Sequence, residues 1–410
     1  MESKKQHIIN ELKLNWLCQE WETVLLLNSN GQGTDYLALA NSTSKSCKTS
    51  DLNQLQNWLN EHKDTWTLGY FGYDLKNELE KLSSCNDDVL NMPDSYFFVP
   101  EVLLRLTNKV EVLIGDFTGF KNAEFEEPIK SSSKFQWKES KQAYVKQILK
   151  IKDHIQHGDI YELNYCHEFY LKDAKINPSQ LYMELNQLTR APFSTFLKMG
   201  DQFVSCASPE RFIRKKGNRV ISQPIKGTIK RGANSKEDAF LVKKLKNDPK
   251  ERSENIMIVD LVRNDLSKIA MNNTVNVDEL CEVYSFRTVH QMISTVSAEA
   301  NPSYSNTDIL LACFPMGSMT GAPKVRAMKL IEKYEKTKRG VYSGSIGYFS
   351  PDGDFDFNVV IRALIYNANK AYLSGIVGGA ITSKSNPNNE YDETKLKAQA
   401  LIEAIEKCIK

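Results

Sequence analysis

The chain has 410 residues, with 53 Lys or Arg against 51 Asp or Glu, so its formal net charge is only +2. This balance leaves no bulk basic field, which argues against nucleic acid or an anionic membrane as the main partner. No apolar run reaches the ~18 residues that a membrane span needs, and the polar N-terminus lacks a signal-peptide core. The eight cysteines are scattered without a CxxC pair, as is typical of reduced thiols, so we expect a cytoplasmic protein.

Residues 1–130 form one compositional zone, in which apolar runs typical of strands alternate with polar loops. The clearest predicted strands in this zone are Val24–Leu27, Tyr96–Leu106 and Val110–Ile114. The small polar run at 131–134 is the best linker candidate. We therefore expect a first part over 1–130 and a second part over 135–410, which together form one intertwined unit.

The second part opens with a predicted helix over 139–157, where the apolar residues Val145, Ile148, Leu149 and Ile155 recur at helical spacing. Another helix is predicted from Pro323 to about Tyr334. Strands are predicted over 161–170, 203–212, 340–349, 355–366 and 371–377. Strands in bulk with helices between them predict an α+β protein, with one large sheet system flanked by helices.

Residue types that favour helix starts mark three further helices. Ser235 followed by Asp238 resembles a capping box for a helix that ends near Lys246. Asp248 followed by proline predicts an N-cap and a first helical residue, for a helix that ends near Asn264. A C-terminal helix is predicted to begin at Asn386-Pro387, and its expected buried side consists of Leu396, Leu401 and Ile405.

Two pairs of glutamates stand at helix starts with the same spacing. Glu251 and Glu254 lie three residues apart in one predicted helix, and Glu390 and Glu393 do so in another. Residues with this spacing share a helix face, so each pair presents two carboxylates in one direction. If the two faces meet, the carboxylates would hold Mg²⁺, which prefers oxygen ligands. The alternative is that these acids only complement the helix dipoles.

Two single residues are candidates for acid–base or nucleophilic chemistry. Lys226 lies between Ile and Gly in PIKGT, where burial would lower its pKa and make the amine a nucleophile or base. Glu210 lies in SPERF, where apolar neighbours would keep the carboxyl protonated as a general acid. The alternatives are an exposed lysine in a basic neighbourhood and a glutamate paired with the adjacent arginine.

A further set of groups could receive an anion. Arg362 interrupts an apolar predicted strand, and the backbone N–H groups of Gly378, Gly379 and Ala380 are not shielded by large side chains. Taken singly, each of these has a purely structural interpretation, such as a tight turn or a core ion pair. His290 is one of only six histidines, and a structural role is the alternative for it as well.

Read together and in order, these segments resemble one known family, the chorismate-utilising enzymes. The resemblance covers about residues 140–405, and residues 1–130 match weakly. Leu25–Ser29 is loosely similar to a segment that lines an effector pocket in some relatives. The matching motifs are SPERF, PIKGT, ENIMIVDLVRNDL, VHQMIST, MGSMTGAPKVRAM, SGSIGYF, IRALIY, GGAIT and EYDET.

The resemblance implies two large, mainly antiparallel sheets packed together with helices outside, and a Mg²⁺ ion that bridges chorismate to the protein. By matching position, Glu254 and Glu393 would bind the metal with Glu251 and Glu390 beside them. Glu210 would be the general acid that helps to expel the C4 hydroxyl of chorismate, and His290 would lie near the ring. The groups implied to hold the substrate are Thr320, Tyr342, Arg362, Gly378, Gly379 and Ala380.

Lys226 indicates which branch of the family the chain resembles. Anthranilate synthases carry PIAGT, which leaves ring carbon C2 open to ammonia, whereas PIKGT is similar to component I of aminodeoxychorismate synthase. In that branch a neutral lysine amine attacks C2, and ammonia then adds at C4. Water-using relatives have a lysine at the position of Glu162, where ammonia-using relatives often have glutamine. The sequence leaves the role of Glu162 open.

The implied partners are chorismate and a separate glutamine amidotransferase subunit, because none of the cysteines lies in a GxCxG-like elbow. The chain alone is expected to use ammonium salts at high pH and not glutamine. Nothing resembles a lyase, so another enzyme is expected to release pyruvate. Three alternatives remain open: an anthranilate synthase component I, a water-using isochorismate or salicylate synthase, and a non-catalytic chorismate-binding regulatory subunit.

Overall fold

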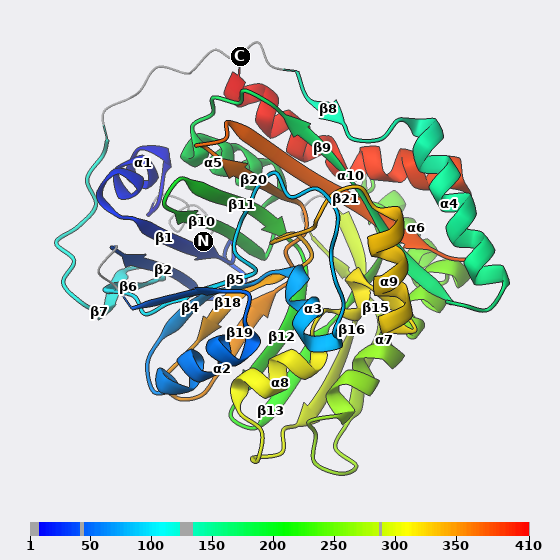
Figure 1. Ribbon diagram of the computed structural model, residues 1–410, viewed down its shortest axis with the longest axis horizontal. Coiled ribbons are helices and arrows are strands. Elements are labelled where there is room, and N and C mark those ends of the chain that lie inside the picture. The colour runs from blue at the N-terminus through cyan, green and yellow to red at the C-terminus, as the bar shows by residue number, and fades with distance from the viewer. Residues whose placement is uncertain (1–7, 42–44, 124–133, 287–288, 410) are drawn as a thin grey trace.

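The computed structural model describes residues 8–41, 45–123, 134–286 and 289–409, and arranges their strands in two large sheets (Figure 1). Every ladder between the named strands is antiparallel. Helices lie outside the sheets, so the expected α+β fold with two packed antiparallel sheets is confirmed.

In the described part of the chain, the first sheet has eleven strands. Their order is β17 (Gly321–Ala322), β9 (Glu162–Leu171), β21 (Tyr372–Ile381), β20 (Ala363–Asn367), β11 (Gln202–Ser208), β10 (Phe193–Met199), β1 (Thr23–Asn28), β2 (Asp35–Ala40), β6 (Val102–Leu106) and β7 (Val110–Ile114), with β8 (Gln136–Trp137) paired to β9.

The second sheet has ten strands among the described residues. Their order is β14 (Ile225–Lys230), β16 (Val289–Glu299), β13 (Arg219–Gln223), β12 (Arg211–Lys216), β19 (Phe355–Asn358), β18 (Ser345–Phe349), β4 (Thr67–Phe71), β5 (Ser95–Phe98) and β3 (Ser46–Thr49), with β15 (Asn276–Ser285) paired to β16.

The helices cover the outer faces of the sheets (Figure 1). Helices α1, α5 and α10 contact the first sheet, and α7 contacts β14 and β16 of the second. The α-helices are α1 (Glu11–Glu20), α2 (Leu52–Glu61), α3 (Lys76–Glu80), α4 (Lys141–Gln156), α5 (Pro178–Thr189), α6 (Ser235–Lys246), α7 (Pro249–Ser267), α8 (Asn306–Cys313), α9 (Lys324–Tyr334) and α10 (Pro387–Ile409), and the 3₁₀ helices are η2 (Tyr73–Leu75) and η3 (Gly317–Met319). No helix within the described ranges combines the length and the apolar character that crossing a membrane requires.

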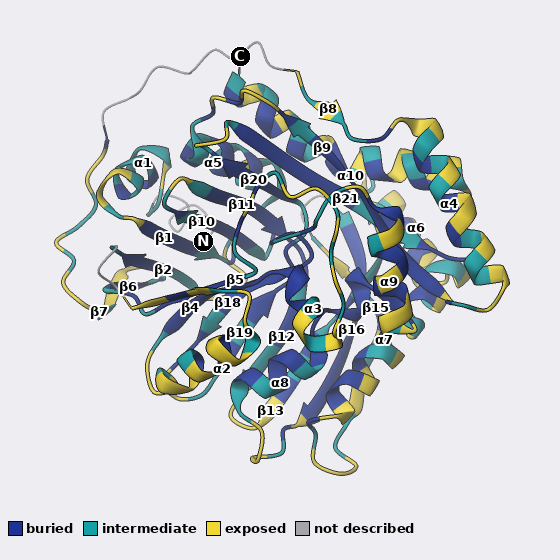
Figure 2. Cartoon of the chain, in the orientation of Figure 1, coloured by how far each residue is buried: buried dark blue, intermediate teal, exposed yellow. Residues whose placement is uncertain are grey.

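Strand β1 shows why the first sheet is buried on both faces. Successive side chains of a strand point to opposite faces. Leu25 belongs to the core that includes the side chains between the two sheets, whereas Val24 and Leu26 belong to the core under α1, α5 and α10. The strands in the centre of the molecule are accordingly buried, while exposure concentrates on the helices and outer loops (Figure 2).

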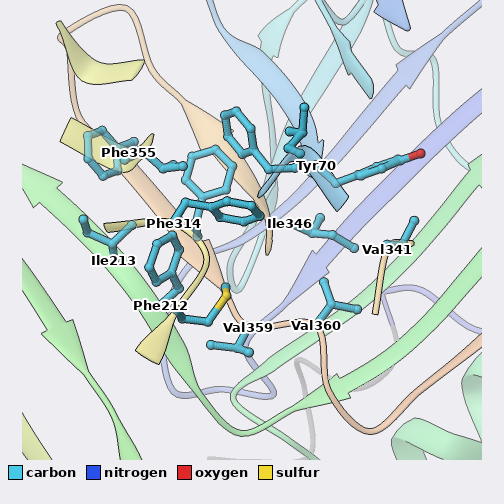
Figure 3. Packing of buried hydrophobic residues seen from close by; sticks show 14 of the residues in the cluster. Tyr70, Phe212, Ile213, Phe314, Val341, Ile346, Phe355, Val359 and Val360 are labelled. Carbon is cyan, nitrogen blue, oxygen red and sulfur yellow. The ribbon is translucent and has the colours of Figure 1, made fainter. Parts of the chain in front are cut away.

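Apolar and aromatic side chains fill the core that includes the second sheet. Phe212 and Phe314 meet edge to face with ring centroids 6.2 Å apart, and Val359 and Val360 lie in the same cluster (Figure 3). Packing of this density fixes the positions of the neighbouring segments. This matters for the site, because Phe212 and Val359 lie within a few residues of Glu210 and Arg362.

Three predicted strands prove to be two strands each. The run 203–212 forms β11 and β12, the run 355–366 forms β19 and β20, and Tyr96–Leu106 forms β5 and β6. In each case the chain passes from one sheet to the other in the middle of the run. In the run 355–366 the apolar residues 359–361 continue through the crossing, so periodicity alone could not reveal it. The other two crossings carry a proline followed by a glutamate, Pro209-Glu210 and Pro100-Glu101. In the predicted strand over 340–349, only Ser345–Phe349 forms a strand, β18.

The helix starts are confirmed in part. Asp248 caps α7 by accepting from the backbone of Lys250 and Glu251, as predicted. The capping box at Ser235 is wrong, because Asn234 is the N-cap of α6, and Asp238 instead binds Arg231.

The apolar faces of the two long helices were predicted with errors. On α4 the buried side chains are Tyr144, Ile148 and Ile151, whereas Leu149 is exposed. On α10 Leu401 and Ile405 are each 1% exposed, as expected, but Leu396 is 68% exposed. Leu396 lies on the side of α10 that faces away from the first sheet, so its predicted burial is wrong.

Both proposed parts of the chain contribute strands to both sheets. Residues before 130 supply β1, β2, β6 and β7 to the first sheet, and β3, β4 and β5 to the second. The predicted linker at 131–134 lies almost wholly outside the described residues.

Candidate active site

Two crossings between the sheets place Glu210 and Arg362 side by side. Glu210 lies where the chain leaves β11 for β12, and Arg362 lies where it leaves β19 for β20. The two crossings are joined by backbone hydrogen bonds from Val359 to Glu210 and from Ala207 to Arg362, each of 3.0 Å. Two residues that are 152 positions apart in the sequence are therefore held together by the topology of the two sheets.

Lys226 lies on a β-bulge at the edge of the second sheet. Between the partners Ile225↔Ile293 and Thr228↔Gln291, β14 has one more residue than β16. Gly227 has φ +85, and a Cβ there would lie 3.1 Å from a carboxylate oxygen of Glu251. Bulges redirect side chains and are common beside active sites. The Lys-Gly order in the sequence is thus what allows the lysine to turn toward the acidic helix start.

Lys226 reaches across to the first sheet, where it meets Glu162. The Lys226 Nζ to Glu162 Oε1 distance is 2.9 Å. Glu162 is 1% exposed and the Lys226 side chain 11%. The second carboxylate oxygen of Glu162 is buried without a hydrogen-bond partner in the described residues. This ion pair joins the two sheets near their edges. Lys226 lies on the edge strand β14, and Glu162 of β9 pairs with the edge strand β17.

The charge of Lys226 differs from the sequence prediction. Burial alone lowers the pKa of the amine, but the carboxylates of Glu162, Glu254 and Glu210 outweigh burial, so its pKa lies above the ordinary lysine value. The predicted burial of the lysine is confirmed in part, since its side chain is 11% exposed. The prediction of a depressed pKa is wrong for the chain by itself, because the buried amine is surrounded by carboxylates.

Glu210 has the properties expected of a protonated acid. It is 4% exposed, and Ser318 of η3 donates a 2.8 Å hydrogen bond to its Oε1. Burial raises its pKa to about 7, although the Ser318 hydroxyl and the charge of Lys226 both oppose this shift. A carboxyl group with this pKa exists in both protonation states near neutral pH and can donate a proton.

The two pairs of glutamates do converge. Lys250, in the first turn of α7, lies 3.8 Å from Glu254 and 3.9 Å from Glu390 of α10. Glu393 forms a 2.8 Å ion pair with Lys397, which lowers its pKa. Gly379 of β21 lies beside the same group, since a Cβ there would be 3.6 Å from Glu390 Oε2 and 3.9 Å from Glu393 Oε1.

The carboxylate oxygens of this cluster suit a hard cation, although the described side chains do not form a complete coordination shell for one. Glu254 Oε1 is buried without a hydrogen-bond partner among the described residues, and burial raises the pKa of Glu254 to about 7. No three His, Cys, Asp or Glu side chains within the described ranges are arranged as a ready metal-binding group. Mg²⁺ often takes only one or two protein carboxylates, with water and substrate completing its coordination. The orphaned oxygen and the acidic surroundings therefore fit such an ion.

Arg362 is held in an unusual conformation. Its φ is +51, in the left-handed region that non-glycine residues rarely adopt. Among the described residues, its guanidinium group donates no hydrogen bond, and the charge that acts on it is that of Glu210. A guanidinium that is mostly buried and has no bound anion is suited to receive a carboxylate.

Gly378, Gly379 and Ala380 belong to β21, which extends beyond the predicted strand over 371–377. They pair with β9, opposite Cys166, Tyr165 and Asn164. The ladder between β21 and β20 stops at Gly375, so beyond that residue β21 has a described strand partner on one side only. Its other edge opens next to the crossing that carries Arg362, as an anion-binding edge requires.

Tyr342 lies close to this edge. The Cys166 thiol donates a 3.8 Å hydrogen bond to the Tyr342 hydroxyl, and a Cβ on Gly378 would clash with the Cys166 sulfur at 2.4 Å. Thr320 is fully buried, and its hydroxyl donates to the backbone carbonyls of Met316 and Gly317.

His290 belongs to a different network. It is fully buried on β16, with Nε2 2.9 Å from Asp238 and Nδ1 2.8 Å from Ser285. Both ring nitrogens therefore form hydrogen bonds with other residues and contact neither Lys226 nor Glu210. The structure brings together the other predicted acid–base and metal-binding residues but does not bring His290 into contact with them.

Three contributors were not assigned from the sequence. Glu162 was noticed only as a departure from glutamine, and its contact with Lys226 depends on how the two sheets meet. Ser318 and Lys250 carry no local signal, although each is close in sequence to a predicted residue. The contacts of Glu162 with Lys226 and of Ser318 with Glu210 join segments far apart in the chain, whereas Lys250 contacts Glu254 within one helix.

A cavity of about 550 Å³ lies between the sheets next to this site. Leu27, Asn28 and Ser29 line it, which is where the loose resemblance to an effector-pocket segment falls. Pro209 and Ile225 also line it, so the cavity borders the residues that directly precede Glu210 and Lys226.

Comparisons with known proteins agree with this geometry. The family model described as chorismate binding enzyme matches residues 10–403. Aminodeoxychorismate synthase component 1 of Escherichia coli is 34% identical over 350 residues, which cover 83% of this chain and 77% of that protein. The probable chloroplastic aminodeoxychorismate synthase of Oryza sativa is 39% identical over 281 residues, or 68% of this chain. This match spans only 31% of the rice protein.

A solved structure gives the same fold. Anthranilate synthase component I from Streptococcus pneumoniae superimposes with a TM-score of 0.76 and 27% identity, over 92% of this chain and 89% of that one. The likeness in fold therefore extends to a relative whose name assigns a different product. The fold therefore does not distinguish between the possible products, and the distinction has to come from individual side chains in the site.

Proposed function

Because the chain belongs to the family of chorismate binding enzymes, we propose that it is the aminating component of an aminodeoxychorismate synthase. In this proposal it converts chorismate and ammonia to 4-amino-4-deoxychorismate, the precursor of the 4-aminobenzoate used for folate. The observation that supports this most is Lys226, a buried amine held at the acidic cluster. An anthranilate synthase would carry alanine at this position, and would leave C2 free for ammonia.

The proposed reaction begins with substrate binding. Arg362 and the open edge of β21 at Gly378–Ala380 receive the carboxylates of chorismate, with Tyr342 beside them. Mg²⁺ would be held by Glu254 and Glu393, with Glu251 and Glu390 nearby, and when bound it would supply positive charge to the ring carboxylate. Arg362 meets the requirement that a mostly buried cation has an anionic partner.

The proposed chemistry then uses Lys226 and Glu210. The Lys226 amine forms a bond to C2 while the bond between C4 and its hydroxyl oxygen breaks. Glu210 donates the proton with which this oxygen leaves as water. Ammonia forms a bond to C4, and the bond between C2 and the Lys226 nitrogen breaks. The Glu210 carboxylate takes a proton back from the new C4 ammonium group, which completes the cycle.

We propose that ammonia comes from a separate glutamine amidotransferase subunit. Of the eight cysteines, Cys85 alone is exposed, and it lies in a loop without regular structure. An amidotransferase nucleophile needs an accessible thiol at a strand-to-helix elbow. The chain by itself should therefore work with ammonium salts at high pH and should not use glutamine. Robust glutamine-dependent turnover by the pure chain would contradict this assignment.

Product analysis tests the proposal. The chain is incubated with chorismate, Mg²⁺ and ammonium, aminodeoxychorismate lyase is added, and the aminobenzoate isomer is identified. We expect 4-aminobenzoate. Formation of 2-aminobenzoate without the lyase would assign the chain to anthranilate synthesis. Turnover without any ammonia source would favour a water-using synthase, and chorismate binding without turnover would favour a regulatory subunit.

A further inference from the structure

The raised pKa of Lys226 creates a requirement that the proposed reaction has to meet. An ammonium group has no free electron pair, so Lys226 has to lose one proton before its nitrogen can attack a carbon atom. The amine is buried, which limits the access of water as an acceptor. The proton therefore needs a receiving group on the protein, within hydrogen-bond reach of Nζ.

Five carboxylates act on Lys226. They are Glu162 of β9, Glu210 between β11 and β12, Glu251 and Glu254 of α7, and Glu393 of α10. Glu210 must hold a proton of its own to release the C4 oxygen, so it is not available as an acceptor. Glu254 and Glu393 are assigned to the metal, with Glu251 beside them. Glu162 is the carboxylate to which the proposed reaction gives no other role.

The geometry of Glu162 suits this task. Its Oε1 already accepts a 2.9 Å hydrogen bond from Lys226 Nζ, so proton transfer needs no movement of either side chain. Its Oε2 is buried without a hydrogen-bond partner among the described residues, so little in the site stabilises a negative charge on this oxygen apart from the lysine. When substrate excludes water, a neutral acid–amine pair gains relative to an ion pair.

We propose that Glu162 accepts the proton of Lys226 and thereby activates the amine, an inference that rests on the proposed function. The proton moves from Lys226 Nζ to Glu162 Oε1, and the neutral amine then forms its bond to C2. When ammonia displaces the lysine, the nitrogen leaves as a neutral amine. It takes the same proton back from Glu162, so this part of the cycle has no net proton exchange with solvent.

The test measures the formation of the Lys226 adduct with chorismate in the absence of ammonia, so that the titration of ammonia itself plays no part. The rate of adduct formation is measured by rapid quenching and mass spectrometry between pH 6 and pH 9. The chain is compared with Glu162→Gln, in which the amide oxygen still accepts from Lys226 but cannot take a proton. Glu162→Asp is the matched control that keeps a carboxylate.

In Glu162→Gln the amine has to lose its proton to solvent, so the ratio of its rate to the native rate should rise about tenfold for each pH unit. Taking the ratio cancels the effect of Glu210, which is common to both proteins. The ratio for Glu162→Asp should stay constant with pH. Chorismate affinity, measured by calorimetry, should change little in Glu162→Gln and so report that the variant is folded.

A pH-independent ratio for Glu162→Gln would overturn the inference and leave the proposed function standing. The absence of any adduct in the native chain would instead reject the scheme on which the inference rests. A ratio that varies with pH in Glu162→Asp as strongly as in Glu162→Gln would also overturn it, because the carboxylate would then not be the relevant group.

Discussion

The Ser318 hydroxyl donates a 2.8 Å hydrogen bond to Glu210, which lies 108 positions away in the sequence. The bond connects η3 to the crossing between β11 and β12, and it favours the ionised form of the carboxyl group. Burial acts in the opposite direction and prevails, which leaves the pKa of Glu210 at about 7. The balance between these two effects sets the pH range in which Glu210 can act as an acid.

Glu210→Gln keeps an acceptor for Ser318 but has no proton to give. We expect adduct formation to slow by about 10²- to 10⁴-fold, with chorismate affinity nearly unchanged. In the native chain the rate should fall as pH rises through about 7, because Glu210 loses its proton. Single-turnover rates across this range provide the measurement. A native rate that shows no decline above pH 7 would contradict the role of Glu210.

Ser318→Ala tests the same balance from the other side. Removal of the hydroxyl removes a bond that lowers the pKa of Glu210, so the decline in rate should move to higher pH. The pH profile of adduct formation reports this shift. A shift to lower pH would mean that another group controls the profile.

Glu254→Gln should abolish Mg²⁺ binding and activity together. The carboxylate that it removes is the one whose Oε1 is buried without a hydrogen-bond partner among the described residues. Calorimetric titration with MgCl₂ is the direct measurement, and turnover is the second. Asp260→Asn on the same helix is the matched control, since Asp260 is exposed and pairs only with Arg263 in the described contacts. An active Glu254→Gln variant that needs no Mg²⁺ would show that the metal assignment is wrong.

Arg362→Ala should weaken chorismate binding about 10- to 100-fold, the range expected for loss of a charged hydrogen bond. The effect should appear in the dissociation constant measured by calorimetry. Arg263→Ala is the control, because that arginine is exposed on α7 and forms an ion pair with Asp260. Equal affinities of the two variants would remove Arg362 from the substrate site.

Leu401 and Leu396 offer a matched pair on α10. Leu401→Ala should reduce the free energy of unfolding by about 2–5 kcal/mol, because it leaves a cavity under the helix. Leu396→Ala should change it by less than about 0.5 kcal/mol, since this side chain is exposed. Urea denaturation of both variants checks the packing of α10, which carries Glu390 and Glu393.

The sequence was most informative where a local pattern has a local cause. The cap at Asp248, the spacing of the glutamate pairs and the glycine after Lys226 each follow from the geometry of one short segment. The crossings at Glu210 and Arg362 could not be found in this way. Arg362 follows the apolar run 359–361 and Glu210 follows Pro209, but only the pairing of distant strands shows that each segment passes from one sheet to the other.

The same limit explains the errors in the site. The pKa of Lys226 depends on carboxylates from several distant segments, so its own neighbours in the sequence could not predict the direction of the shift. His290 was selected because histidines are rare in the chain, but its ring faces Asp238 at the start of α6. Leu396 fits an apolar helix pattern, and only the position of the sheet shows that it is exposed.

Intact-mass spectrometry of the chain after incubation with chorismate and Mg²⁺, without ammonia, tests the role of Lys226 most directly. The account predicts a mass increase equal to chorismate minus one water, which peptide mapping locates at Lys226. Lys226→Ala should show no increase and should form no 4-amino product. A native chain that stays unmodified, or a Lys226→Ala variant that still aminates C4, would contradict the account.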